Sequence, residues 1–561
     1  MEKAIPAAAE ISIVRGTPVV PGVAYGPVVR PAPRPQIPTT FERIPDTARD
    51  AEAERFRAAA GAVAERLRSR AGRASGAAAE VLLANAQLAE DRGWLGAVAA
   101  KIRSGSGAIE AAVGATDQFA DMFTKLGGLM AERVTDLLDI RDRVIAELAG
   151  HPEPGLDLPD EPSILLAEDL APADTAGLDP SRVIGLATTL GGPTSHTAII
   201  ARQLGIPCVV AAADLDTVPA GVRVLLDGAA GELRLDPDPE EAAAAVAAAR
   251  SEQARIASWA GPGATEDGHR VEILANVQDG AGARAARATP AEGVGLFRTE
   301  LCFLDRETEP TVEEQAEIYA EVFSAFAGRK VVLRTLDAGS DKPLRFVDHP
   351  DEHNPALGLR GIRIANATEG LLDRQLDAVA AAAARTGTEP WVMAPMIATV
   401  AETAHFAAAV RARGLVPGVM VEVPAAALLA ERLLEHVDFL SIGTNDLAQY
   451  TMAADRMSPH LASLTDPWQP AVLALVARTA AAGRAAGKRV GVCGEAAADP
   501  LLGCVLAGMG VTSLSCAAAA VAGVGSRLAA VTLDRCREAA DEVLRAVDPG
   551  EARDAAARVL A

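Results

Sequence analysis

The sequence is poor in aromatic residues and in positive charge. Its 561 residues include only 11 Phe, 4 Trp and 3 Tyr, and 53 Lys and Arg stand against 75 Asp and Glu, for a net charge of −22. Hydrophobic cores must therefore be built from aliphatic side chains, and aromatic platforms for stacking bases are missing. A polyanion of this size repels nucleic-acid backbones and anionic membranes, so we expect neither as a partner.

Cysteine is also scarce, and long apolar runs are missing. The six Cys residues show none of the closely spaced pairs that are typical of zinc sites. So few cysteines in a long chain indicate a reducing compartment. The first residues lack the apolar core of a signal peptide, and no run approaches the roughly 18 apolar residues that span a bilayer. We therefore expect a cytoplasmic protein without membrane insertion.

What is present indicates a folded chain of several domains. Half of the residues are apolar and 23% are charged, as in ordinary globular proteins. Short apolar runs between glycines and prolines predict one or two strands within residues 11–29. Apolar side chains three and four positions apart predict a helical subdomain over 46–150. Alternating strand and helix patterns follow from Ser163, and an Ala-rich segment from Pro239 predicts a single linker helix.

Beyond this helix, eight short β-rich runs alternate with helical segments, which predicts a (β/α)8 barrel. The runs are 271–276, 293–298, 331–336, 391–396, 418–423, 439–443, 489–493 and 513–516. Any one polar residue at the end of such a run could simply mark where a strand leaves the core. Seven of them, however, stand at the C-terminal ends, where barrel enzymes build their sites: Asn276, Arg298, Arg334, Glu422, Asn445, Asp446 and Cys493.

A second candidate site is the string GGPTSHTAIIAR at 191–202. The two glycines permit a tight turn, and Thr194 or Ser195 can cap a helix, which leaves His196 in the first helical turn. Free backbone N–H groups and the helix dipole favour a neutral, nucleophilic imidazole there and stabilise a phosphoryl group placed on it. A plain capped loop is the alternative interpretation of the first five residues taken alone.

The whole string resembles the phosphohistidine signature of the phosphoenolpyruvate-utilising enzymes. Residues 418–449, with GVMVEVPAAA and FLSIGTNDLAQY, resemble their second signature. The order of parts is most similar to enzyme I of the phosphoenolpyruvate-dependent sugar phosphotransferase system. The resemblance implies an α/β multidomain protein with a swivelling phosphohistidine α/β domain (1–35 and 151–238), an inserted helical phosphocarrier-docking subdomain (36–150), a linker helix (239–262) and a phosphoenolpyruvate-binding (β/α)8 TIM barrel (263–561).

This resemblance also implies an activity and a set of site residues. His196 would take the phosphoryl group from phosphoenolpyruvate and hand it to a histidine of the phosphocarrier protein HPr, releasing pyruvate, as the first general step of sugar phosphotransfer. A homodimer through the barrel is implied as well. The implied site comprises the substrate contacts Arg298, Arg334, Lys342, Asn445, Asp446 and Arg456, the Mg²⁺ ligands Glu422 and Asp446, and the proton donor Cys493.

These residue types suit that chemistry. A phosphate and a carboxylate on one small molecule call for several bidentate cations, and two carboxylates are the hard oxygen ligands that Mg²⁺ prefers. Loss of the phosphoryl group leaves an enolate that must be protonated, and a thiol at a cationic rim can do this. Because His196 and the barrel pocket lie on separate units, the phosphohistidine domain must swing, with hinges near residue 150 and in the linker helix.

Three stretches depart from the family pattern, and two rivals share it. Pro193 stands where many members have Arg or Met, residues 84–87 lack the His and Met of better-known docking helices, and small residues fill 517–525 where Ile-Pro is usual. Phosphoenolpyruvate synthase and pyruvate phosphate dikinase carry both signatures, but they need a large nucleotide-binding domain, for which we expect too few residues ahead of His196. A regulatory paralogue that only binds partners is the other rival, against which the intact site residues argue.

Overall fold

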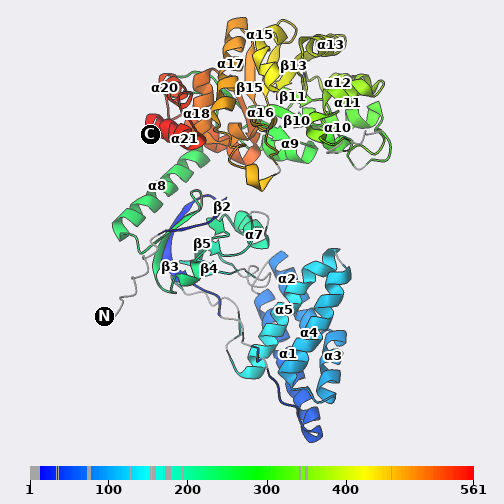
Figure 1. Ribbon diagram of the computed structural model, residues 1–561, viewed down its shortest axis with the longest axis vertical. Helices are drawn as coiled ribbons and strands as arrows, with labels where there is room; N and C mark the ends of the chain where they lie inside the picture. Colours follow the sequence, from blue (N-terminus) through cyan, green and yellow to red (C-terminus); the bar gives the residue numbers. More distant parts are fainter. Residues whose placement is uncertain are drawn as a thin grey trace, which may run out of the picture. The chain divides into compact units, whose positions relative to one another are not determined.

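The computed structural model describes residues 13–561 apart from 33–34, 36, 39, 73–76, 127, 152, 155–159, 169, 171–177, 193–194, 305, 340–342, 348–351 and 457. The side chains of 77–81, 126, 128–132, 135, 196 and 459 also lie outside the description. The chain divides into two compact units, Met1–Glu252 and Gln253–Ala561 (Figure 1). Across the described part of the chain, no helix has the length and apolarity needed to cross a membrane.

The first unit contains a group of antiparallel helices and an α/β sheet. After a short 3-10 turn, η1 (Asp46–Ala48), come α1 (Arg49–Ala71), α2 (Ala77–Ala89), α3 (Arg92–Arg103), α4 (Ala108–Leu126) and α5 (Gly128–Ala149). Their shared core is mostly Ala, Val and Leu, with a few large side chains at its centre. Phe56 meets Trp94 edge to face with ring centres 5.4 Å apart, and Trp94 Nε1 donates to Thr116 Oγ1 at 3.1 Å.

The sheet has eight strands in the order β1-β8-β7-β3-β4-β5-β6-β2. They are β1 (Ile13–Arg15), β2 (Thr17–Val20), β3 (Val23–Val29), β4 (Ser163–Ala167), β5 (Val183–Thr188), β6 (Cys208–Val210), β7 (Arg223–Asp227) and β8 (Glu232–Leu235). The prediction of one or two strands in 11–29 was too low, because Gly16 and the Pro21-Gly22 pair divide that stretch into three. A further short 3-10 turn, η2 (Leu215–Thr217), precedes β7.

Helix α7 (His196–Leu204) follows β5 and begins where the sequence predicts. Ser195 is its N-cap, with its hydroxyl accepting a hydrogen bond from the backbone N–H of Ala198 at 3.3 Å. The helix ends at Gly205, whose φ of 67° favours glycine. The chain then passes through α8 (Pro239–Ser258), the predicted linker helix.

The second unit is a closed barrel of eight parallel strands surrounded by helices (Figure 1). The strands are β9 (Glu272–Val277), β10 (Val294–Arg298), β11 (Val331–Arg334), β12 (Trp391–Ala394), β13 (Val416–Val421), β14 (Phe439–Ile442), β15 (Arg489–Val492) and β16 (Ser513–Ala517). Each of the eight predicted runs overlaps one strand. Seven of the eight are buried along most of their length, which is why they appear in the sequence as short continuous apolar runs, whereas β15 begins with the exposed Arg489.

Helices connect and cover these strands. They are α9 (Gly280–Arg287), α10 (Val312–Ala325), α11 (Ile362–Ala367), α12 (Leu371–Thr386), α13 (Val400–Arg411), α14 (Pro424–Leu428), α15 (Ala430–Leu433), α16 (Thr444–Met452), α17 (Pro470–Ala486), α18 (Pro500–Met509), α19 (Val521–Leu528), α20 (Leu533–Val543) and α21 (Pro549–Leu560). Short 3-10 turns are η3 (Glu300–Cys302), η4 (Pro355–Leu357), η5 (Pro459–Leu461), η6 (Glu495–Ala498) and η7 (Ala518–Ala520). The small-residue stretch 517–525 therefore still forms a turn and the start of a helix.

The barrel interior is packed, which confines any site to its rim. Inside lie Leu296, Val332, Met393, Met420, Phe439 and Cys493. At the N-terminal end, the rings of Trp391 and Phe439 are 4.9 Å apart, Lys330 Nζ sits 4.2 Å from the Trp391 ring centre, and Glu272 pairs with Lys330 at 2.9 Å. This end is closed by packing and ion pairs, so chemistry belongs at the C-terminal end.

Candidate active site

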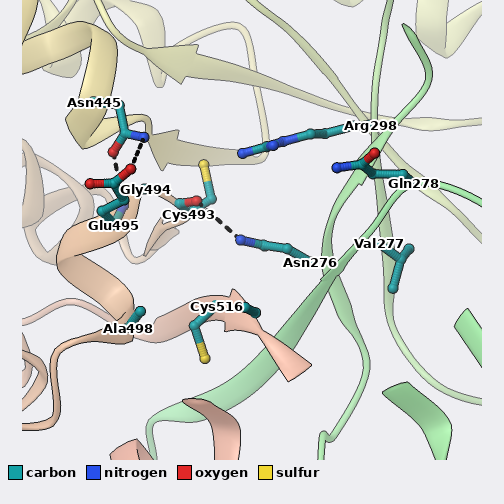
Figure 2. A pocket seen from close by; sticks show the side chains of 11 residues that line it. Asn276, Val277, Gln278, Arg298, Asn445, Cys493, Gly494, Glu495, Ala498 and Cys516 are labelled. Carbon is teal, nitrogen blue, oxygen red and sulfur yellow. Dashed lines mark hydrogen bonds between the residues drawn. The ribbon is translucent and has the colours of Figure 1, made fainter. Parts of the chain in front are cut away.

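A cavity of about 370 Å³ opens at the C-terminal end of the barrel. It is lined by seven of the residues that the sequence selected: Arg298, Arg334, Glu422, Asn445, Asp446, Arg456 and Cys493. An adjoining cavity of about 270 Å³ shares Arg298, Asn445 and Cys493 with it and adds Asn276 (Figure 2). Lys342 and Pro193 lie outside the described residues. The scattered sequence positions thus meet in one pocket.

Strand ends explain why these residues converge. Arg298 and Arg334 are the last residues of β10 and β11, and Glu422 and Cys493 directly follow β13 and β15. Asp446 lies in the first turn of α16, which begins just after β14. Because parallel barrel strands end at one rim, residues far apart in the chain come within a few ångströms.

Arg298 is a cation without an ion-pair partner in the described part of the chain. Its Nε is buried and makes no hydrogen bond. Figure 2 shows its side chain reaching toward that of Cys493, and its charge lowers the pKa of that thiol, although burial and other groups outweigh it. A half-buried guanidinium with unused donors is suited to bind a phosphate or a carboxylate.

Arg334 is instead held by two carboxylates. Its Nη2 donates to Glu300 Oε1 at 2.9 Å, and its Nη1 lies 3.1 Å from Asp337 Oδ2. Burial alone would lower the pKa of Arg334, but the charges of Glu300, Asp337 and Glu422 outweigh it and raise that pKa. The sequence reasoning missed Glu300 and Asp337, which fix the orientation of this arginine.

A second buried arginine, Arg360, was also missed. It lies 3.3 Å from both Asp337 and Asp446, and its Nη1 donates to Tyr450 Oη at 3.3 Å. Arg360 follows a long irregular segment after β11, far in sequence from any strand end. An isolated bridge between Gly339 and Arg360 returns it to that strand's exit. A search restricted to strand ends could not find it.

The carboxylates of the site crowd one another. Glu422 is 1% exposed, and its Oε2 accepts a hydrogen bond from the Met396 N–H at 2.8 Å. Burial, followed by the charges of Asp446 and Asp337, raises the pKa of Glu422 to about 8. Asp446 Oδ1 is buried without a hydrogen bond, 3.3 Å from Arg360, and Oδ2 lies 3.9 Å from Arg456.

This donor set fits a divalent cation. Mutual repulsion of buried carboxylates falls when a metal lies between them, and carboxylate oxygen is the ligand that Mg²⁺ prefers. Among the residues that the structure describes, no group of three or more His, Cys, Asp or Glu side chains is assembled to hold a metal ion. Mg²⁺ in proteins is commonly held by one or two carboxylates, with substrate phosphates and water as its other ligands.

Cys493 is a buried thiol beside the cavity. Its thiol is 2% exposed, and Sγ lies 3.6 Å from the carbonyl oxygen of Ile442. Burial raises the pKa of Cys493 to about 11, with a hydrogen bond involving Ser441 acting in the opposite direction. The group is therefore a protonated thiol at neutral pH, next to the cavity.

Asn445 connects two loops of the rim. Its Oδ1 accepts a hydrogen bond from the Glu495 N–H at 2.8 Å, and its Nδ2 donates to Glu495 Oε1 at 3.4 Å (Figure 2). Glu495, which the sequence reasoning did not select, therefore ties the segment of Cys493 to the segment of Asp446. On the other side, Asn276 Nδ2 donates to the carbonyl oxygens of Cys493 and Ser515.

Three family models match this chain in succession. The N-terminal model of phosphoenolpyruvate-utilising enzymes covers residues 15–133, the mobile domain covers 159–231, and the phosphoenolpyruvate-binding domain covers 253–533. A phosphoenolpyruvate-protein phosphotransferase of Streptomyces coelicolor is 48% identical over 98% of this chain and 99% of its own length. The chain belongs to the family of phosphoenolpyruvate-protein phosphotransferases.

A second relative agrees with this membership. A phosphoenolpyruvate-protein phosphotransferase of Haloferax volcanii is 41% identical, covering 83% of this chain and 85% of its own. A solved structure titled as an NMR solution structure of Enzyme I is 30% identical, with a TM-score of 0.39, over 43% of this chain and 99% of that one. As a member of the phosphotransferase family, the chain is an enzyme that uses phosphoenolpyruvate, and its barrel belongs to the phosphoenolpyruvate-binding part.

Proposed function

We propose that this phosphotransferase moves the phosphoryl group of phosphoenolpyruvate to His196 and from there to a histidine of the phosphocarrier protein HPr. Pyruvate leaves the barrel, and the reaction opens sugar phosphotransfer. The observation that carries this proposal is the rim cavity, where Arg298, which has no ion pair with any described residue, faces crowded carboxylates. Such a pocket suits a small dianionic or trianionic substrate together with a divalent cation.

The arginines would contact the substrate in different ways. Arg298 has free donors and would bind the phosphate or carboxylate directly. Arg334 is oriented by Glu300 and Asp337, so it meets the substrate in a preset direction. Arg456, with a 32% exposed side chain, and Lys342 would contribute from the outer edge. In this arrangement Asn445 holds the rim together through Glu495 while Asp446 faces the substrate.

Glu422 and Asp446 would hold Mg²⁺ when it is bound. The metal supplies positive charge that offsets the charge on the substrate oxygens during in-line transfer. Glu422 must be ionised to serve as a ligand, so binding of the cation would displace its proton. The backbone N–H of Met396 already fixes one of its oxygens, and Glu422 lines the cavity.

Cys493 would protonate the enolate that remains after transfer. Its proton is retained at neutral pH because burial disfavours the thiolate. The Sγ lies on the wall shared by the two cavities, and Arg298 reaches toward it (Figure 2). A positive group near the thiol stabilises the thiolate that forms as the proton leaves.

Each part of the chain would have its own role. The phosphohistidine domain would comprise 1–35 and 151–238, the docking subdomain 36–150, the linker helix 239–262 and the barrel 263–561. His196, at the start of α7, would visit the barrel and then the carrier. A barrel-mediated homodimer and a cytoplasmic location remain predictions from the sequence.

Pyruvate release in the absence of ATP tests the proposal against its dikinase rival. With HPr and Mg²⁺ present, wild type should release pyruvate steadily, and Glu422→Gln should lose at least about 100-fold, the cost of a buried charged ligand. Glu435→Gln is the matched control, because Glu435 is exposed and its ion pair with Arg432 lies on the surface. An absolute need for ATP, or full activity of Glu422→Gln, would refute the proposal.

A further inference from the structure

Cys504 on α18 and Cys536 on α20 are two buried thiols that phosphoryl transfer does not use. Both are 0% exposed, and their interaction raises the pKa of Cys504 and lowers the pKa of Cys536. Cys504 Sγ also lies 3.4 Å from the carbonyl oxygen of Pro500, one turn earlier in α18. Both are free thiols in the structure.

The two helices approach closely because glycine stands between them. Gly508 lies one turn after Cys504 on the same face of α18, and a Cβ atom at this position would overlap the carbonyl group of Cys536. Only glycine permits this separation of the helix backbones. A disulfide requires two backbones that approach this closely, and the two thiols are near enough to shift each other's pKa.

The pair is chemically unequal. The hydrogen bond with Cys504 lowers the pKa of Cys536 in spite of burial, and the same hydrogen bond raises the pKa of Cys504. By contrast, burial raises the pKa of Cys208, Cys302 and Cys516 to about 12. The thiolate is the nucleophilic form of cysteine, so Cys536 is the member of the pair that attacks first.

We infer that local opening of helix α20 exposes the pair. Its buried face carries only small or medium side chains, namely Cys536, Ala539, Ala540 and Val543. Little apolar area is therefore lost when the helix lifts, and local opening costs less than global unfolding. A small oxidant can reach the thiols during such openings.

We propose that Cys504 and Cys536 form a redox-active dithiol that a peroxide converts to a disulfide between α18 and α20. The Cys536 thiolate attacks one oxygen of hydrogen peroxide, the O–O bond breaks, and hydroxide leaves and takes up a proton, so that a sulfenic acid remains. Cys504 then attacks the sulfenic sulfur, forms the S–S bond and releases water. Two thiols are oxidised and one peroxide is reduced to two waters.

The other cysteines are not arranged for this reaction. Cys493 and Cys516 line the same cavity, but Figure 2 shows their sulfur atoms pointing to opposite sides. Closure of the 504–536 bridge would hold the start of α18, which directly follows the η6 turn and the Cys493 segment. The bridge also restricts the unfolded chain, so it should stabilise the barrel.

The test treats the full-length protein with hydrogen peroxide, stops the reaction with catalase, and counts thiols in denaturant before mapping peptides without reduction. Wild type should keep four of its six thiols and yield a linked 504–536 peptide. Its melting temperature should rise by roughly 5 °C. A reductant should restore all six thiols and the original melting temperature.

Variants separate this pair from general oxidation. Cys504→Ser and Cys536→Ser should form no linked peptide, whereas the matched control Cys302→Ser, which replaces a buried thiol elsewhere in the barrel, should still lose two thiols. In Cys504→Ser, a dimedone adduct should appear on Cys536. The proposal is overturned if wild type keeps every thiol at a peroxide dose that fully oxidises free glutathione, or if thiols are lost without the 504–536 linkage.

Discussion

At the scale of single residues, the site depends on which cations are already satisfied. Arg334 and Arg360 are held by carboxylates on several sides, whereas no described residue forms an ion pair with Arg298. Removing a partnered arginine leaves a buried charge uncompensated and destabilises the fold. Removing Arg298 leaves no ion-pair partner uncompensated among the described residues, so its loss should affect substrate binding far more than stability.

Arg298→Lys should therefore weaken the use of substrate without lowering the stability of the fold. The variant keeps the charge but loses the planar fork, and we expect kcat/KM for phosphoenolpyruvate to fall roughly 10- to 100-fold, as for loss of a charged hydrogen bond. The melting temperature should stay within about 1 °C of wild type. Arg432→Lys, on the exposed surface of the same barrel, is the control. Unchanged kinetics with reduced stability would show that Arg298 is a structural residue.

The raised pKa of Cys493 predicts how the reactivity of this thiol depends on pH. Because its pKa lies at about 11, the thiolate fraction should rise about tenfold per pH unit from pH 7 to 10 without reaching a plateau. Iodoacetamide labelling of Cys493, followed by peptide mapping, should show this slope in its rate. Between pH 7 and 9 nearly all Cys493 side chains keep their proton. The rate of pyruvate formation should therefore not fall through deprotonation of Cys493 in this range. A labelling plateau near pH 8.5 would mean an unperturbed thiol and would remove the argument for a proton donor.

Residues of the barrel site could be predicted from the regular pattern of strands only where they stand at the end of a strand. Arg298, Arg334, Glu422 and Cys493 were found because they stand at strand ends in a regular pattern. Glu300 was missed because a 3-10 turn brings it to the cavity wall, and Arg360 because an isolated bridge far from any strand end returns it to Asp337 and Asp446. Of the stretch 84–87, Asn85 and Ala86 prove to be buried in α2, which leaves Gln87 as its exposed side chain.

At the scale of elements, the barrel strands were predictable because burial on both faces makes them continuous apolar runs. Strands β1, β2 and β8 were harder, since they have three or four residues each and bury only part of their side chains. Their existence depends on pairing across the sheet, for example β1 with β8, which join residues more than 200 positions apart. Local patterns carry no information about such partners.

Glycines inside the barrel give a stability prediction at this scale. A Cβ at Gly295 in β10 would lie 2.5 Å from Ser515 Cβ and 3.0 Å from Leu274 Cβ, inside the closed interior. Gly295→Ala should lower the free energy of unfolding by about 1–3 kcal/mol, as overpacked cores do. Gly523→Ala in α19 is the control, because a Cβ there would meet Pro500 Cγ only at 3.7 Å, an ordinary van der Waals distance. Urea titrations that rank the two variants equally would contradict this packing.

At the scale of the whole molecule, the distribution of charge governs which ligands and partners the protein attracts. The chain carries a net charge of −22, while the rim collects several arginines within one pocket. The clustering lets an acidic protein attract an anionic substrate locally. The same acidic background favours a carrier protein with a basic face.

This charge predicts a salt dependence of carrier recognition. The association rate constant for HPr, measured by stopped flow, should fall by at least about tenfold between 10 and 300 mM salt, whereas the dissociation rate should change much less. The effect follows from screening of long-range attraction, because the Debye length shortens over this range. A flat profile would argue against electrostatic steering.

The central claim is that His196 carries the phosphoryl group between donor and carrier. The most direct measurement is transfer of ³²P from labelled phosphoenolpyruvate to the protein in the presence of Mg²⁺, with and without HPr. We predict one acid-labile label per chain on the peptide that contains His196, no label on His196→Ala, and loss of the label from wild type when HPr is added. Equal labelling of His196→Ala, or label that stays on the enzyme with HPr present, would contradict the account.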